Sequence, residues 1–387
     1  MGLSLRCHAD EVLGVQITKL RLFNYRNIKE LEIYPSGGTS LFSGRNGQGK
    51  TNLLEAIYLL GYGKSFRTSI PKECIRHGQI ECRVDGVIEH NSLKKDLQIS
   101  ITKTEKKLLF LGKRVPLDEF VGNLHVLAFA NEHLRVVRGG PADRRAFIDR
   151  AMIFLFPSHV RDLANYGRAL RQRNSVLSSF REKDRSVDGN LLDSWDEALV
   201  GPGSRIMANR FRYVEQMKEE LPEGLFGSES LKIRYISSAV TDTASISEIE
   251  ENFRQRLFQV RTQDCRSGHT SVGPHRDDLK LYVNGKSLVD FGSAGQQRSS
   301  LLVLYFSQME IHRKVHDFYP IFLVDDAEAE LDDQRLNAFL EYLSQRTQTF
   351  LTSAKGFFMS AIFGNACLFN IQNGTVAPSP NDIIPNN

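Results

Sequence analysis

Residues 44–51 have the types and spacing of a phosphate-binding loop. They read Gly-Arg-Asn-Gly-Gln-Gly-Lys-Thr and fit the pattern G-x-x-x-x-G-K-[ST]. A β-prone run at 39–43 precedes them, and an apolar stretch with helical spacing follows at 52–60. Such glycines let backbone N–H groups surround a β-phosphate, and the helix N-terminus adds positive potential there. Strand, glycine loop and helix together favour nucleotide binding over a chance match in a glycine-rich loop.

The loop supplies most of the predicted nucleotide contacts. Lys50 is expected to reach the β- and γ-phosphates and to assist catalysis there, and the Thr51 hydroxyl is expected to join the ligands of Mg²⁺. A turn follows the alternating strand predicted at 15–22, and Tyr25 in this turn is expected to stack on adenine. The predicted contacts on this side of the nucleotide are Tyr25, Arg26, Asn27, Gly44, Arg45, Asn46, Gly47, Gln48, Gly49, Lys50, Thr51 and Asn52.

A second candidate element ends in two acids. The apolar run 321–324 is followed by Asp325 and Asp326, as in a buried central strand that delivers carboxylates to its C-terminal edge. In a phosphate-loop ATPase the first carboxylate holds Mg²⁺, directly or through water. We therefore predict Asp325 as a metal ligand and Asp326 as the catalytic base or water-positioning group. A buried strand with a merely polar turn is the less favoured alternative, because a phosphate loop lies upstream.

A third element, residues 291–298, is a turn of small residues that leads into the apolar run 301–306. The N-terminus of such a helix is a further anion site. The stretch resembles the signature loop of ABC-type ATPases, usually Leu-Ser-Gly-Gly-Gln, and Ser293, Gly295 and Gln296 carry the resemblance. In that superfamily the loop binds the γ-phosphate held by the phosphate loop of a second subunit. The resemblance therefore implies a nucleotide sandwiched between two copies of the chain.

Several positions depart from the superfamily pattern. Ala294 stands where the signature loop usually has glycine, and Ala329 stands where serine usually precedes the D-loop aspartate, here Asp332. The catalytic histidine expected further on is missing, which leaves Thr352 or Ser353 as a weaker substitute. The second acid of the pair is also shorter than the usual glutamate. We therefore predict slow, Mg²⁺-dependent ATP hydrolysis, which suits a switch.

The rest of the chain predicts two parts. A chain of 387 residues exceeds one simple core, and its composition, 41% hydrophobic and 25% charged, is that of a folded protein. Helical periodicity dominates residues 143–220, with Pro202 at an expected helix boundary. We therefore predict an α/β fold: an ABC-type phosphate-loop ATPase head with a mixed sheet, made from residues 1–120 and 255–387. Residues 121–254 are predicted to form an inserted, mostly helical lobe.

Strand patterns and cysteines add two expectations. Residues 81–111 contain three β-prone runs separated by turns, which fits an antiparallel meander, and Asn284-Gly285 is a strong hairpin signal. No stretch approaches the roughly 18 apolar residues needed to span a membrane. The five cysteines lie far apart without C-x-x-C spacing. This predicts reduced thiols, no cysteine zinc site and a cytoplasmic protein.

A cluster of arginines makes DNA a candidate partner. The formal charge of +4 is too small to prove one, so only local clustering carries weight. No recognition-helix motif is visible, so binding is expected to depend on salt and not on sequence. The alternative is a solvated helix face with local ion pairs. The candidate DNA contacts are Arg144, Arg145, Arg161, Arg168 and Arg171, of which the last three are spaced to share one helix face.

Several short segments, in the same order, are similar to the RecF family of recombination and repair proteins. They are residues 46–57, 64–68, 143–149, 172–174, 273–278 and 295–298. The resemblance implies an ATP- and DNA-binding clamp with weak ATPase activity and with ATP and Mg²⁺ as cofactors. It implies an ATP-dependent homodimer that grips duplex, gap or junction DNA and releases it on hydrolysis. It also implies RecO and RecR as partners in loading recombinase at single-strand gaps and stalled replication forks.

Two other functions remain open. The protein could be a DNA-bound scaffold whose hydrolysis is incidental, and the sequence does not separate that function from a true switch. It could also be the ATPase subunit of a membrane transporter, although the long helical insertion counts against this. Within 273–278, His275 and two acids could suggest a metal site, but a structural turn before the strand at 279–283 is favoured.

Overall fold

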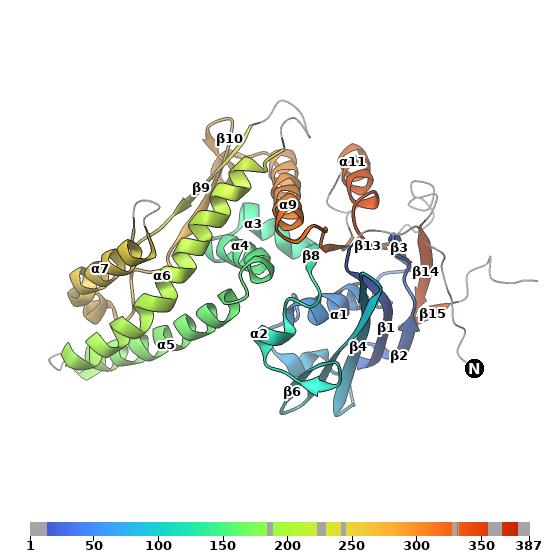
Figure 1. The fold of residues 1–387 in the computed structure, drawn as a ribbon, viewed down its shortest axis with the longest axis horizontal. Coiled ribbons are helices and arrows are strands. Elements are labelled where there is room, and N and C mark those ends of the chain that lie inside the picture. The colour runs from blue at the N-terminus through green and yellow to red at the C-terminus, as the bar shows by residue number, and fades with distance from the viewer. Residues whose placement is uncertain are drawn as a thin grey trace, which may run out of the picture. The chain divides into compact units, whose positions relative to one another are not determined.

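The structure is a computed structural model, and it describes residues 14–183, 189–222, 230–240, 245–326, 331, 333–354 and 366–377. The chain forms two compact units, whose elements are labelled in Figure 1. Unit 1 comprises Met1–Glu132 and His312–Asn387, and unit 2 comprises His133–Ile311. The Ala329 and Asp332 positions of the predicted D-loop lie outside the described residues.

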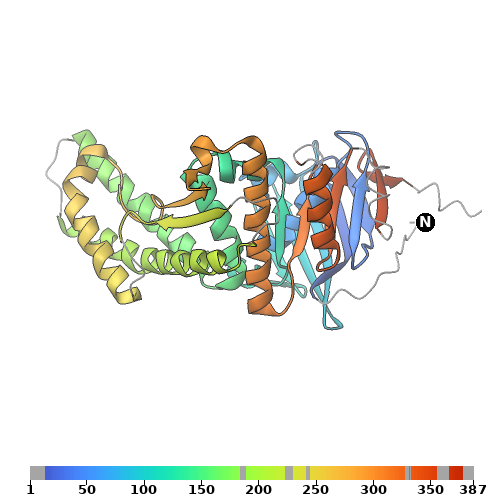
Figure 2. The same ribbon diagram turned by 90° about the horizontal axis from the view of Figure 1, so that it is seen from above.

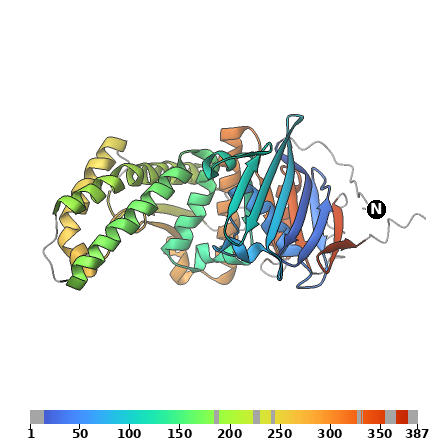
Figure 3. The same cartoon turned by 90° about the horizontal axis from the view of Figure 1, so that it is seen from below.

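Unit 1 contains an antiparallel sheet with the strand order β2-β1-β4-β5-β6-β7, whose strands lie side by side in Figure 3. Its strands are β1 Gln16–Tyr25, β2 Ile28–Ile33, β4 Glu81–His90, β5 Leu93–Thr102, β6 Lys106–Phe110 and β7 Lys113–Arg114. Buried residues alternate with more exposed ones along β4 and β5, as in a sheet covered on one face. The meander predicted for residues 81–111 is confirmed.

A mixed sheet in unit 1 has the strand order β15-β14-β3-β13-β12-β8. Its strands are β3 Thr39–Ser43, β8 Val126–Phe129, β12 Ile321–Val324, β13 Thr349–Ser353, β14 Cys367–Gln372 and β15 Thr375–Ala377. All neighbouring pairs are parallel except β14 and β15. Every residue of β3, β8, β12 and β13 is buried, as expected for parallel strands covered on both faces. The C-terminal ends of these strands therefore meet at one edge.

Two helices cover the mixed sheet. Helix α1, Lys50–Tyr62, packs against both sheets of unit 1, which explains why it is apolar almost all round. Helix α11, Asp333–Ser344, lies beside the mixed sheet (Figure 2). The ring of its Phe339 contacts those of Phe129 and Phe322. Three short helices complete the described part of this region: η1 Pro71–Cys74, α2 Leu117–Phe120 and η2 Asn131–Leu134.

Unit 2 is mostly helical. Its helices are α3 Arg135–Arg138, α4 Pro141–Leu155, α5 His159–Lys183, α6 Gly189–Glu219, α7 Ile246–Ser267, α8 Leu288–Phe291 and α9 Ala294–His316, the last of which runs on into unit 1. The strands β9 Leu231–Ile236, β10 Asp278–Val283 and β11 Lys286–Ser287 form an antiparallel sheet. Asn284 and Gly285 both have positive φ, 50° and 79°, so the predicted hairpin turn is confirmed.

The long helices α5, α6 and α7 pack against one another around a buried cation. Arg173 is fully buried and donates to Asp196 at 2.6 Å and to Asp264 at 2.7 Å. Because a buried charge is costly unless it is paired, this network requires all three helices to be in register. It also explains why the units divide later in the chain than predicted, since α7 and the β9–β10 pair belong with α5 and α6.

Helix α6 is continuous through Pro202, so the prediction of a helix boundary there is wrong. A proline inside a helix costs one backbone hydrogen bond, but packing on α5 and α7 holds the helix together. Gly203 permits this close packing, because a Cβ there would lie 2.7 Å from Phe253 and 3.1 Å from Tyr166.

No helix in the described part of the chain is long and apolar enough to cross a membrane. Cys74, Cys82 and Cys265 carry free thiols.

Candidate nucleotide-binding site

The loop between β3 and α1 has the backbone shape that its glycines allow. Gly44, Gly47 and Gly49 all have positive φ, at 146°, 79° and 112°. A Cβ at Gly44 would lie 2.4 Å from the carbonyl oxygen of Ile371, so a larger residue would push the loop off the sheet. The tip at residues 45–47 is exposed. The predicted strand, loop and helix are thus present in the order that phosphate binding requires.

Lys50 is buried and turns back over the loop. Its Nζ donates to the carbonyl oxygens of Gly44 at 2.6 Å and of Arg45 at 3.1 Å. These are weak anchors for an ammonium compared with phosphate oxygens, because a charge-assisted bond to an anion is stronger. The ammonium is therefore held where phosphate oxygens placed in the loop would compete for it.

The two predicted metal ligands lie next to each other. The Thr51 hydroxyl, in the first turn of α1, donates to Oδ1 of Asp325 at 2.9 Å. Asp325 directly follows β12, and burial raises the pKa of its carboxyl. Neighbouring ligands of an octahedral Mg²⁺, each at about 2.05 Å, lie about 2.9 Å apart. The oxygens of Thr51 and Asp325 therefore fit a shared Mg²⁺ ion without rearrangement.

Asp326 sits beside this pair on a tight turn. It is exposed and has a φ of 50°, and its backbone N–H donates to the Thr352 hydroxyl at 2.9 Å. The same hydroxyl donates to Oδ1 of Asp325 at 2.7 Å. Thr352, suggested as a substitute for a missing histidine, therefore links the two acids. Ser353, the other suggested substitute, is fully buried in β13.

The turn at residues 25–27 differs from the prediction. Tyr25 is completely buried, so the prediction that it stacks on adenine is wrong. Arg26 makes a two-pronged ion pair with buried Glu55, at 2.5 and 2.9 Å, and donates to the carbonyl of Glu73. These contacts give Arg26 a structural role, and its predicted nucleotide contact stays a prediction. The sequence could not show that the strand continues through Tyr25 into the core.

Asn27 lies against the loop as expected. Its amide donates to the carbonyl of Gly47 at 3.3 Å and accepts from Asn52 at 2.7 Å. Arg67, which the prediction missed, donates to Asn52 at 2.8 Å and remains 39% exposed. Gln48 is held from the other side, since its side chain accepts the N–H of Asn373 at 2.6 Å. In the sequence, Arg67 stands out only through the segment 64–68, which resembles the RecF family.

The predicted signature loop caps helix α9 in unit 2. The Ser293 N–H donates to the side chain of Gln296 at 2.9 Å, and the Gln296 N–H donates to the Ser293 hydroxyl at 3.2 Å. This reciprocal capping box fixes the loop's shape. Ser293 is exposed and Gly295 half-buried, while the neighbouring Phe291 is 73% exposed.

The candidate DNA contacts separate into two groups. Arg144 is buried and holds Asp278 with bonds of 2.7 and 3.0 Å, so the prediction that it contacts DNA is wrong. Arg145 is half-buried and donates to the carbonyl of Asp277 at 2.6 Å. Arg161, Arg168 and Arg171 are exposed on α5.

The surface of α5 is basic where the structure describes its side chains. The only carboxylate on α5 up to residue 180 is Asp162, which is buried and paired with Arg205 at 2.8 Å. Asp162 therefore does not neutralise the exposed arginines of that helix.

The segment 273–278 is a structural turn. His275 uses both ring nitrogens, with the Tyr166 hydroxyl at 2.6 Å and the Thr270 carbonyl at 3.1 Å. Buried Asp277 accepts from Tyr235 and from Ser238. These contacts favour the structural interpretation of the segment over a metal site.

Comparisons with known proteins agree with this geometry. Residues 16–376 match the family model described as RecF/RecN/SMC N terminal domain. The DNA replication and repair protein RecF of Streptococcus thermophilus is 36% identical over 366 residues, which are 93% of this chain and 98% of that protein. The protein of the same name from Geobacillus kaustophilus is 35% identical over 371 residues, 94% of this chain and 100% of that protein.

Solved structures extend the likeness to the fold. A structure of the recombination mediator protein RecF with ATPrS, in the RecFOR pathway, is 30% identical with a TM-score of 0.87, over 94% of this chain and 98% of that one. An Smc head bound to the C-winged helix domain of ScpA is 15% identical with a TM-score of 0.50, over 93% of this chain and 95% of that one, a likeness of fold alone. The predicted ABC-type α/β fold is confirmed.

Proposed function

Because this chain belongs to the RecF family, we propose that it binds ATP between two copies of itself, grips DNA in that state and acts in recombinational DNA repair. The observation that carries the proposal is the contact between Thr51 and Asp325 at 2.9 Å, beside a complete phosphate loop. This contact brings together two segments that are 274 positions apart in sequence, at the edge of the mixed sheet where its parallel strands end.

The site needs a second copy to be complete. The loop, Lys50, Thr51 and Asp325 bind one side of the nucleotide and its Mg²⁺. The signature loop at Ser293, Gly295 and Gln296 stands at the start of a long helix, whose N-terminal end favours an anion. In the homodimer this loop closes on the γ-phosphate held by the partner copy.

Hydrolysis is slow and serves as a switch. ATP with Mg²⁺ supplies the phosphoryl group that reacts with water. Asp326, oriented through its N–H bond to Thr352, positions that water and accepts its proton. Lys50 neutralises charge on the phosphates. Asp326 is shorter than the glutamate of faster ATPases, so turnover is slow and the ATP-bound dimer persists on DNA.

DNA binds through α5 and not through base edges. Arg161, Arg168 and Arg171 are exposed there, and Arg145 is half-buried nearby in sequence. Such arginines contact phosphates, so duplex, gap and junction DNA all bind without sequence preference. The relative solved with ATP belongs by its description to the RecFOR pathway, which supports RecO and RecR as partners and recombinase loading as the outcome.

The test is retention of DNA by the parent and by variants that cannot use ATP. Lys50→Ala and Asp325→Asn should release duplex DNA at least tenfold faster than the parent when ATP is present. Lys113→Ala, an exposed lysine away from the loop, is the control and should behave as the parent does. Equal retention by all four proteins would favour the DNA-bound scaffold with incidental hydrolysis and would contradict the switch.

A further inference from the structure

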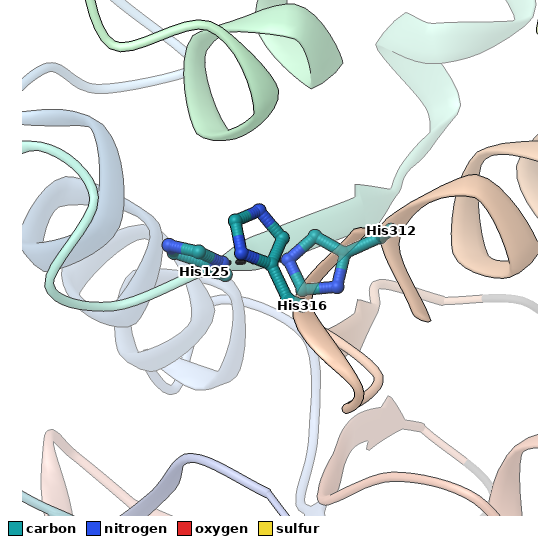
Figure 4. A group of neighbouring side chains, drawn as sticks. All are labelled: His125, His312 and His316. Atoms are coloured by element: carbon teal, nitrogen blue, oxygen red, sulfur yellow. Dashed lines mark hydrogen bonds between the residues drawn. The ribbon is translucent and has the colours of Figure 1, made fainter. Parts of the chain in front are cut away.

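Three histidines of unit 1 come together away from the nucleotide site. His125 directly precedes β8, while His312 and His316 lie one turn apart at the end of α9. Figure 4 shows the three rings turned toward one another. One ligand nitrogen from each lies within 4.8 Å of the others. Two histidines at i and i+4 on one helix face, joined by a third from another element, form a common ligand set for transition metals.

Backbone carbonyls fix where two of the rings carry their protons. His125 Nε2 lies 2.9 Å from the carbonyl oxygen of Gly122, and His312 Nδ1 lies 2.8 Å from that of Phe318. A carbonyl only accepts, so each of these nitrogens donates its hydrogen. In neutral rings the other nitrogens, Nδ1 of His125 and Nε2 of His312, then carry lone pairs. Histidines anchored in this way are typical metal ligands, because the carbonyl orients the ring.

The two lone pairs face each other at 2.6 Å. Two acceptors repel each other at this distance, so a positive species between them, either a proton or a metal cation, would stabilise the arrangement. A proton would leave an imidazolium in a buried place, since His125 is 6% and His312 4% exposed.

We propose that His125, His312 and His316 bind a divalent transition-metal cation of the Zn²⁺ type. Neutral imidazole suits such ions, and three histidines leave a fourth position for water. Nitrogen ligands of tetrahedral Zn²⁺ lie about 3.3 Å apart, so the facing nitrogens separate by about 0.7 Å when the ion enters. His316 is only half-buried and offers the route of entry.

The site is separate from the nucleotide site. The carbonyl of His125 accepts the N–H of Ile321, so the cluster lies at the start of β8 and β12, whereas Asp325 follows the end of β12. The four residues of β12 separate the two edges by about 13 Å. The cation would pin the end of α9 to the mixed sheet of unit 1, and α9 begins at the signature loop.

The test is zinc binding to the full-length protein in excess Mg²⁺, after removal of metals with a chelator. The parent should bind one Zn²⁺ per chain by calorimetry, and Co²⁺ in its place should give the visible absorption of a tetrahedral site. His316→Gln should weaken Zn²⁺ binding about tenfold or more, with its circular dichroism and ATP binding unchanged. His77→Gln, which changes an exposed histidine of the same unit, should bind zinc as the parent does.

Two results would overturn the proposal. One is that His316→Gln binds zinc as tightly as the parent does. If zinc binding were lost in Asp325→Asn instead, the ion would belong to the nucleotide site. The other comes from nitrogen-15 spectra of the histidine rings. They should show zinc shifting Nδ1 of His125 and Nε2 of His312, whereas a proton shared between them that survives excess zinc would contradict a metal site.

Discussion

At the scale of single residues, a hydroxyl joins the two acids of the nucleotide site. Thr352 donates to Asp325 and accepts from the backbone N–H of Asp326. Asp326 is held at a positive φ of 50°, and this bond fixes the direction of its backbone N–H. In the proposed mechanism, the position of Asp326 therefore depends on a residue that does not itself need to touch the nucleotide.

Replacing this hydroxyl should slow hydrolysis more than it weakens binding. Thr352→Val keeps the shape of the side chain but leaves the Asp326 N–H without its acceptor, a loss of about 1–3 kcal/mol. We expect ATP turnover to fall about 5- to 100-fold, while the dissociation constant for ATP changes little. Phosphate release and titration with a fluorescent ATP analogue measure the two quantities. Thr352→Ser, which restores the hydroxyl, should recover most of the ATP turnover. If Thr352→Ser turned ATP over as slowly as Thr352→Val, the hydrogen bond would have no role.

Residues differ in how far the sequence reveals them. The phosphate loop is local, so its glycines, Lys50 and Thr51 were identifiable from eight adjacent positions. Tyr25 and Arg144 were misjudged because their burial depends on partners far away, such as Asp278 for Arg144. The cluster of His125 with His312 could not be predicted from the sequence for the same reason, since 187 positions separate the two residues.

At the scale of elements, the helices of unit 2 are locked by Arg173 and its two buried aspartates. Arg173→Leu would leave Asp196 and Asp264 without their shared cation. We expect the free energy of unfolding to drop by about 3–5 kcal/mol in urea titrations. Arg168→Leu, on the exposed side of the same helix, should change it by at most about 0.5 kcal/mol. Similar losses in both variants would mean that the network does not stabilise the unit.

The ion pair between Asp149 and Arg210 makes the stability of unit 2 depend on pH. Burial alone would raise the pKa of Asp149, but the charge of Arg210 and hydrogen bonds from His159 and Arg210 hold it well below its ordinary value. A lowered folded-state pKa contributes stability that is present above the unfolded value of about 3.9 and is lost as pH falls below it. Unfolding in urea at pH 6 and pH 3.5 should therefore show a steeper loss in the parent than in Asp149→Asn. Parallel losses would contradict this assignment.

The exposed arginines of α5 should set the salt dependence of DNA binding. Replacing Arg161, Arg168 and Arg171 with alanine removes up to three phosphate contacts. We expect weaker binding to every duplex and a salt slope reduced by about 0.9 per lost contact. Fluorescence anisotropy across a salt series measures this slope. Alanine at the exposed Lys29, Lys103 and Lys113 is the matched control, and an equal effect there would remove α5 from the DNA-binding surface.

Strands and turns could be predicted where the pattern that specifies them lies within a few adjacent residues. The meander at 81–111 and the Asn284-Gly285 hairpin followed from alternation and turn chemistry. Helix α6 was divided in error because Pro202 disfavours a helix locally, whereas packing on α5 and α7 keeps it whole. Tertiary contacts of this kind leave no local pattern in the sequence.

At the scale of the whole molecule, the sequence predicts that the signature loop and the phosphate loop both belong to the ATPase head. In the structure Ser293 belongs to unit 2 and Lys50 to unit 1, and α9 passes from one unit to the other. Helix α7 packs along α5 and α6, and this packing sets the division into units. It leaves no pattern in the sequence from which it could be predicted. The two halves of the proposed site therefore belong to different units of the chain.

The central claim is that ATP joins two copies of this chain. Light scattering of the purified protein with Mg²⁺, with and without ATP, measures it most directly. We predict that ATP doubles the mass from that of one 43.8 kDa chain, and that Lys50→Ala stays at one chain under the same conditions. A parent protein that binds ATP and keeps the same mass would contradict the composite site.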